Sequence, residues 1–178
     1  MLLSLLHNTP AVAVYYDSAN DWLFVDWRGD LDLPMVQAGC LTLAECFLTR
    51  SYARVLNSNC DVVSMSADVA PWMVHEYLPR MVVAGIEYIA WVCAPSPLAK
   101  YVANEAERQL QGPMVATFED LADAYAWLSN ARPTRQALPP TAAWQSRLRE
   151  RVATLSDELA RYQQVSRLVV TPARGLAA

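Results

Sequence analysis

Hydrophobic and polar residues alternate in two short stretches near the N-terminus. Residues 12–16 and 22–27 are rich in β-formers, and a cluster of turn-forming residues, 17–21, separates them. This arrangement is typical of a β-hairpin. Alternation divides the second stretch into two faces, Trp22, Phe24 and Asp26 on one and Leu23, Val25 and Trp27 on the other.

The hydrophobic spacing then changes from two to about 3.6 residues. After Pro34, which suits the first turn of a helix, a stripe recurs at the spacing of a helix packed on a sheet. Its members are Val36, Cys40, Leu43 and Phe47. A second helix is expected after Asp68, a suitable N-cap, and it should bury Trp72, Met73 and Tyr77. Pro79 should kink this helix or start a new segment, and Gly85 should end it in a left-handed conformation.

Shorter hydrophobic runs complete an alternation of strands and helices. Strands are predicted at 54–56, where Asn57 ends the strand, and at 86–93 and 114–117. Helices are predicted from Ser96-Pro97 to about Leu110 and after Thr117-x-x-Asp120, which resembles a capping box. The pattern predicts an α/β fold with a mainly parallel sheet, an N-terminal β-hairpin and helices between the later strands.

The chain outside residues 11–130 has a different character. Residues 1–10 form an N-terminal arm, 131–140 a proline-rich linker, 141–166 an appended C-terminal amphipathic helix, and 167–178 a flexible tail. The apolar seam of the C-terminal helix consists of Leu148, Val152, Leu155, Leu159 and Tyr162. It covers about two heptads, so the helix either docks on its own domain or pairs with a second copy in a homodimer.

Charge divides the chain at the same place. Residues 1–130 carry six Lys and Arg against fifteen Asp and Glu, and residues 131–178 carry eight arginines against three acids. The arginines alternate with acids and lack an accompanying aromatic stacking pattern, so nucleic acid is not the expected partner. Docking of the basic helix on an acidic domain, in the same chain or in a second copy, agrees better with this charge pattern.

The hydrophobic segments do not have the form of membrane or export signals. The N-terminal ten residues lack a basic region and stop at Pro10, and the apolar stretch 81–99 is interrupted by Gly85, Pro95 and Pro97. The four cysteines, Cys40, Cys46, Cys60 and Cys93, have no CxxC spacing and suggest reduced thiols. A cytoplasmic protein without a membrane partner is expected.

Motifs for catalysis are missing from the sequence. It contains no glycine-rich phosphate loop and no GxSxG elbow. His75 has no second histidine nearby, and a metal site needs three or four converging ligands. We therefore expect no catalytic residues, no metal and no cofactor.

The polar triplet Asn57-Ser58-Asn59 is unusual at the end of a buried strand. The two asparagines should point to the same face. Their amides either bond the local backbone in a turn, or present donors and acceptors to a partner at the carboxyl edge of the sheet, where α/β proteins commonly bind ligands.

Several segments carry a resemblance to a known family. They are Tyr16, residues 22–27 and 56–59, Trp72, residues 78–81, 84–85 and 88–92, and residues 117–121. With the hairpin followed by alternating elements, they resemble the STAS-like fold of sporulation anti-anti-sigma factors, and more closely small stand-alone bacterial STAS-like proteins of unassigned function. The resemblance covers roughly residues 10–130.

The resemblance implies a non-enzymatic protein that binds partner proteins. Signalling members are switched by phosphorylation at the start of the helix after the third strand, which places the candidate partner-binding or switch residues at Asn57, Ser58, Asn59, Ser64, Ser66 and Asp68. This chain lacks the Asp-Ser-Ser-Gly run of the family at that position. A phosphate there would meet the free N–H groups of a helix N-terminus.

The sequence thus predicts a non-enzymatic bacterial regulatory or scaffolding protein that acts through protein–protein interaction, with a partner not identified. The alternative is a small-molecule or lipid-binding module with an aromatic-lined pocket. Its candidate aromatic residues are Trp22, Trp27, Trp72, Trp91 and Trp127.

Overall fold

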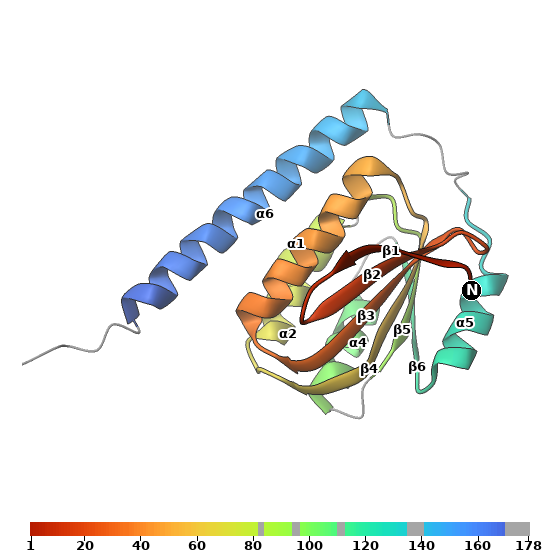
Figure 1. The fold of residues 1–178 in the computed structure, drawn as a ribbon, viewed down its shortest axis with the longest axis horizontal. Coiled ribbons are helices and arrows are strands. Elements are labelled where there is room, and N and C mark those ends of the chain that lie inside the picture. The colour runs from red at the N-terminus through yellow and green to blue at the C-terminus, as the bar shows by residue number, and fades with distance from the viewer. Residues whose placement is uncertain (82–83, 94–96, 110–112, 135–140, 170–178) are drawn as a thin grey trace, which may run out of the picture.

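The computed structural model describes residues 1–81, 84–93, 97–109, 113–134 and 141–169. Its strands form one sheet whose spatial order is the order in the chain (Figure 1). They are β1 (Leu3–Asn8), β2 (Val12–Asp17), β3 (Trp22–Leu31), β4 (Arg54–Met65), β5 (Tyr88–Val92) and β6 (Met114–Phe118). Strands β1 to β3 are antiparallel, and β3 to β6 are parallel. The predicted α/β class is confirmed.

Helices cover both faces of this sheet. On one face lie α1 (Leu33–Thr49), the consecutive segments α2 (Val69–Trp72), η1 (Met73–Tyr77) and α3 (Leu78–Met81), and α4 (Pro97–Gln109), which contacts α2 and η1. The other face is covered by α5 (Leu121–Asn130), which packs on β4, β5 and β6. Strand β3 serves both cores, because Leu23 and Val25 belong to the larger hydrophobic cluster and Trp22 to the smaller one. The alternation predicted for this strand is therefore confirmed.

The N-terminal arm is a strand, which corrects the prediction for residues 1–10. Strand β1 pairs antiparallel with β2 along the edge of the sheet. Leu2 N donates to the buried carboxylate of Asp17 at 3.0 Å, and Ser18 N donates to the Leu2 carbonyl at 3.0 Å. All six residues of β1 are exposed. Since neither face of the strand is buried, its sequence has no alternation that could have revealed it.

Strand β4 is much longer than predicted. It continues through Asn57 to Met65, because its second half pairs with the end of β3, for example Arg28 with Asp61 and Asp30 with Ser64. The polar triplet therefore lies inside a strand and does not form the expected terminal turn.

A new helical segment, α3, begins at Leu78, directly before Pro79, which is one of the two outcomes predicted for this proline. The helix widens into the π-helix η1 before it, where Leu78 N donates to the Met73 carbonyl five residues earlier. Proline has no N–H to donate and its ring would collide with a carbonyl of a regular α-turn, so a wider turn accommodates it. Gly85 has φ +86, which confirms the left-handed position.

The predicted helix caps were only partly right. Asp68 occupies the N-cap position of α2 but makes no capping bond, and its carboxylate accepts from the Ser66 hydroxyl at 2.6 Å. At α5 the cap is Asp120, which accepts from Asp123 N at 2.9 Å, so Thr117 is not the capping residue.

The C-terminal helix α6 (Ala142–Val169) runs antiparallel beside α1 (Figure 1). Leu148 is completely buried in the larger hydrophobic cluster, and Val152 packs against that cluster. The side chains of Leu155, Leu159 and Tyr162, the rest of the predicted seam, lie outside the described residues, as do residues 135–140 of the linker and 170–178 of the tail. The first half of α6 thus docks on its own domain.

Candidate functional site

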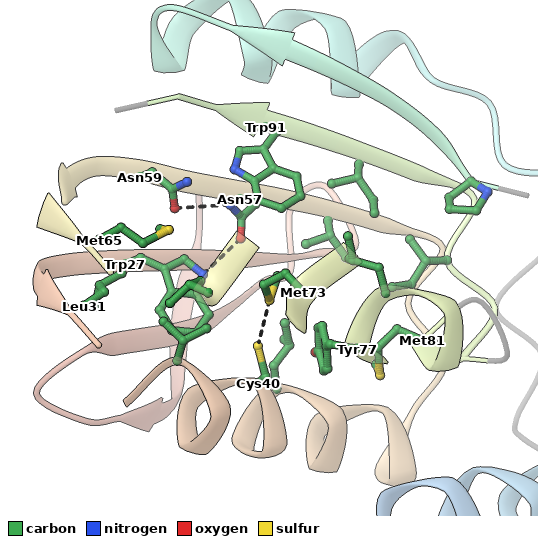
Figure 2. Close-up of a pocket in the computed structure, with 18 residues that line it drawn as sticks. Trp27, Leu31, Cys40, Asn57, Asn59, Met65, Met73, Tyr77, Met81 and Trp91 are labelled. Carbon is green, nitrogen blue, oxygen red and sulfur yellow. Dashed lines mark hydrogen bonds between the residues drawn. The ribbon is translucent and has the colours of Figure 1, made fainter. Parts of the chain in front are cut away.

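A cavity of about 60 Å³ lies between the sheet and the helices α1, η1 and α3 (Figure 2). On a comparable measure a single water needs roughly 10–15 Å³, so the space can hold a small molecule. Most of its wall is aliphatic, aromatic or sulfur-containing. The sheet contributes Trp27, Leu31, Val55, Asn57, Asn59, Met65, Ile89 and Trp91, and the helices and loops contribute Val36, Cys40, Leu43, Val69, Met73, Tyr77, Leu78, Met81, Ile86 and Pro113.

Two asparagines and two tryptophans form the polar end of this cavity. Trp27 on β3 donates through Nε1 to Oδ1 of Asn57 on β4 at 3.1 Å. Asn57 and Asn59 share one face of β4 because side chains alternate along a strand, and Trp91 stands on the neighbouring strand β5, in register with Asn57. Both asparagines are buried.

The amide of Asn59 fits two orientations. In one, Oδ1 accepts from Trp91 Nε1 at 2.9 Å and Nδ2 donates to the Ser58 carbonyl at 3.3 Å. In the other, drawn in Figure 2, Oδ1 accepts from Asn57 Nδ2 at 3.5 Å. The first orientation is favoured, because its bonds are shorter and it pairs both ends of the amide of Asn59, whereas the second turns an N–H donor toward the Trp91 donor.

Tyr77, Cys40 and Met73 form the helical side of the cavity. The Cys40 thiol donates to the Met73 thioether at 3.6 Å, and the buried Tyr77 hydroxyl interacts with the Cys40 thiol but has no oxygen or nitrogen partner among the described residues. Burial raises the pKa of Tyr77 and the pKa of Cys40 well above their ordinary values. Both groups therefore stay neutral, and the tyrosine remains a hydrogen-bond donor across the physiological pH range.

The π-helix η1 positions two of these residues. Met73 and Tyr77 are its first and last members, and both line the cavity. A single widened turn inside a helix is rare and is frequently found at functional sites. Pro79 thus contributes to the shape of the cavity from outside it.

The predicted switch residues divide between several environments. Asn57 and Asn59 meet in the cavity, but Ser58 points to the opposite face of β4, where it accepts from Cys60 N at 3.3 Å. Exposed Ser64 donates to Asp30 on the neighbouring strand, and Ser66 donates to Asp68. The six residues therefore do not form one site, and phosphorylation of a serine stays a prediction.

The sequence predicts the two asparagines and, as an alternative, an aromatic-lined pocket. Of the five tryptophans considered for that pocket, Trp27 and Trp91 line the cavity, whereas Trp22, Trp72 and Trp127 are not among its lining residues. The polar triplet is the signal in the sequence, because a buried strand rarely carries two amide side chains on one face. The hydrophobic pattern predicts Tyr77, Met73 and Cys40 only as core residues. Among the described residues, no group of three His, Cys, Asp or Glu side chains could hold a metal ion.

A second notable surface is the edge strand β1 with the two residues before it. Leu2 is 66% exposed and Leu5 55% exposed, and Met1, Leu3 and Leu6 are also exposed. Several exposed apolar side chains on one edge strand are typical of interaction sites. Within the described part of the chain, no helix is long and apolar enough to cross a membrane.

Comparison with known proteins gives a resemblance to solved structures, but no family model and no curated protein matches the sequence. Among solved structures, an uncharacterised DUF3478-family protein from Shewanella loihica, described as having a SpoIIAA-like fold, matches with 18% sequence identity and a TM-score of 0.49. The match covers 70% of this chain and 99% of the other.

Proposed function

We propose that this protein is a non-enzymatic interaction module, and that it binds an extended segment of a partner protein along β1. The observation that carries the proposal is an open sheet edge that exposes apolar side chains. The STAS-like character of the sequence supports the same class of function, because such domains in general bind proteins and do not catalyse reactions.

The backbone of β1 offers hydrogen bonds to an added strand. The Leu2 carbonyl faces β2, where it accepts from Ser18 N. Because backbone groups of successive residues point to opposite sides of a strand, those of Leu3 and Leu5 face outward. An extended peptide can pair with these groups and become the seventh strand of the sheet.

The side chains of β1 fit an apolar partner segment. Leu5 lies opposite Tyr15 of β2, and Leu3 lies opposite Asp17, so both leucines share one face of the sheet. Natural edge strands are commonly protected by lysine, proline or an inward-pointing charge, and residues 3–6 contain none of these. Since residues 1–130 carry fifteen acidic and six basic residues, we expect basic residues to flank the apolar positions of the partner segment.

A peptide-display selection tests this proposal. Random peptides are selected on the full-length protein and counter-screened on the variant Leu3→Lys/Leu5→Lys, which places two charges on the edge. The expected peptides have alternating apolar residues with flanking Lys or Arg, lose at least tenfold in affinity for the variant, and slow amide hydrogen exchange at Leu3 and Leu5. A matched control, Val63→Lys, adds charge at an exposed site on β4 and should bind them normally.

Two outcomes would overturn the proposal. Peptides that bind the double-lysine variant equally well would place the interaction elsewhere. Dimerisation of the wild-type protein that the two lysines abolish would show that a second copy, and not a partner peptide, occupies the edge. Analytical ultracentrifugation of both proteins separates this case from peptide binding.

The second candidate function is the binding of a small apolar molecule in the cavity. It is supported by the largely apolar lining and by the buried polar groups at the cavity wall. Ligand sites commonly combine an apolar wall with a few well-placed polar atoms. Native mass spectrometry of the full-length protein after mild purification tests it, since a retained small molecule of defined mass is the expected result.

A further inference from the structure

The polar end of the cavity has more donors than acceptors. In the favoured orientation, the single oxygen of Asn59 accepts from Trp91, and that of Asn57 accepts from Trp27. The amide nitrogen of Asn57 then faces the amide nitrogen of Asn59 and has no acceptor among the described residues. If Asn59 turns over to accept from Asn57, the indole N–H of Trp91 loses its acceptor instead. One donor is left over in either case.

On the helical side of the cavity, too, a hydrogen-bond donor lacks a strong acceptor. The Tyr77 hydroxyl is buried, and among the described residues its hydrogen-bonding neighbour is the sulfur of Cys40, with no oxygen or nitrogen acceptor. The Cys40 thiol itself donates to Met73. Sulfur atoms are weak acceptors, so they satisfy a tyrosine hydroxyl poorly. Leaving a buried donor without a partner is unfavourable, and native proteins rarely do so without a functional reason.

We propose that the cavity binds a small apolar molecule that carries a hydrogen-bond acceptor, such as a carbonyl oxygen, and that Tyr77 and Asn57 are its donors. This inference rests on the second candidate function and adds the chemical class of the ligand. A purely apolar molecule would leave the hydrogen-bond donors of the cavity unsatisfied. A ligand with its own donor would add one more donor without an acceptor. A neutral acceptor fits better than an anion, since no cationic side chain lines the described cavity.

Two probes of the same shape test the inference. Cyclohexanone and methylenecyclohexane differ in one atom position, where the ketone has an oxygen and the alkene a CH₂ group. Each is titrated into the full-length protein, and ¹⁵N-edited NMR follows the indole N–H groups of Trp27 and Trp91 and the side-chain amide of Asn57. We expect the ketone to bind about tenfold more tightly, which is the usual worth of one satisfied buried donor.

Two tyrosine variants identify the donor. Tyr77→Phe removes the poorly satisfied hydroxyl and keeps the ring, so it should abolish most of the preference for the ketone without weakening the binding of the alkene. Tyr16→Phe is the matched control, because the Tyr16 hydroxyl donates to Asp21 outside the cavity. The control should retain the full preference.

The possible results separate the two proposals. Equal binding of ketone and alkene, with no effect of Tyr77→Phe, would overturn the acceptor inference and leave apolar binding intact. Binding of neither probe up to its solubility limit, or NMR shifts confined to residues away from the cavity, would overturn both. A preference for the ketone that Tyr77→Phe leaves unchanged would overturn the assignment of Tyr77 as a donor.

Discussion

Trp27 and Asn57, on adjacent parallel strands, are joined by a hydrogen bond of 3.1 Å from the indole Nε1 to the amide Oδ1. The bond lies on the face of the sheet that α1 and η1 cover, beside the cavity. The amide oxygen of Asn57 accepts from the indole N–H of Trp27. The amide nitrogen of Asn57 is then directed at the other polar groups of the cavity. The pair therefore links the packing of the core to the chemistry of the candidate site.

Asn57→Asp should destabilise the protein strongly at neutral pH. The carboxylate has the shape of the amide and can still accept from Trp27, but it places a charge in an apolar environment. We expect a loss of about 3–5 kcal/mol in the free energy of unfolding at pH 7, measured by urea denaturation. Burial raises the pKa of such a carboxyl group in the folded state, so the loss should shrink as the pH falls through that raised pKa.

The control for this change is Val63→Asp, an exposed position on the same strand, 74% exposed. Surface substitutions of this kind usually change stability by less than about 0.5 kcal/mol. Equal losses in the two variants would show that Asn57 is not buried in solution.

Asp17 should make the attachment of β1 depend on pH. Burial opposes its ionisation, but hydrogen bonds from Leu2 N, Asn20 Nδ2 and Ala19 N outweigh burial and lower its pKa. The folded-state pKa lies below the unfolded value, so the stabilisation is present above the unfolded value and is lost as the pH falls through the folded one. The wild-type urea midpoint should therefore change little above about pH 5 and decrease as the pH falls below about 4.

Asp17→Asn should reduce this pH dependence and lower the free energy of unfolding at pH 7 by about 1.5–3 kcal/mol, because it removes a charged acceptor. Asp157→Asn, at an exposed position on α6, is the control and should change neither quantity. A wild-type protein whose midpoint decreased no more than that of Asp17→Asn would contradict the role of this carboxylate.

Tyr77→Phe should leave the ligand-free protein at least as stable as the wild type. The hydroxyl has only the weak sulfur acceptor of Cys40 beside it, so its removal deletes a poorly satisfied buried donor and can raise the free energy of unfolding by about 1 kcal/mol. Tyr16→Phe should have the opposite effect, because the Tyr16 hydroxyl donates to Asp21 at 3.0 Å. Thermal unfolding of both variants checks the pair, and a clear loss in Tyr77→Phe would reveal a partner for its hydroxyl.

Leu148→Ala should destabilise the domain, although the residue lies far along the chain in α6. Its side chain is fully buried against the main cluster, and Leu→Ala substitutions at such sites cost about 2–5 kcal/mol. The exposed neighbour Arg149→Ala is the control. If urea denaturation gave the same stability for both variants, α6 would not dock on its own domain, and pairing with a second copy would become the better interpretation.

The cysteines should differ sharply in reactivity. Cys60 is exposed, whereas Cys40, Cys46 and Cys93 are buried. Burial raises the pKa of Cys46 to about 11, so little thiolate is present near neutral pH. Labelling with iodoacetamide at pH 8 should give one fast adduct, absent in Cys60→Ser. A second fast adduct in the folded protein would contradict the burial of Cys40 and Cys46 on α1 or of Cys93 directly after β5.

Local periodicity was sufficient for much of the fold. The alternation in β3 and the stripe from Val36 to Phe47 depend only on which side chains share a face, and both were recognised from the sequence. The same reasoning placed Asn57 and Asn59 on one face of a strand. The proline and glycine positions at Pro79 and Gly85 were also predictable, because each follows from backbone geometry.

The sequence by itself thus determined the order of most elements and the faces that they bury, since these are properties of neighbouring residues. Only the tertiary structure decided that residues 3–8 form an edge strand and that β4 continues past Asn57, because each depends on pairing with a distant strand. It also decided that two asparagines and Tyr77 meet around one cavity. The empty space and its unsatisfied donors arise where packed elements fail to fill a volume, and no local pattern along the chain encodes that.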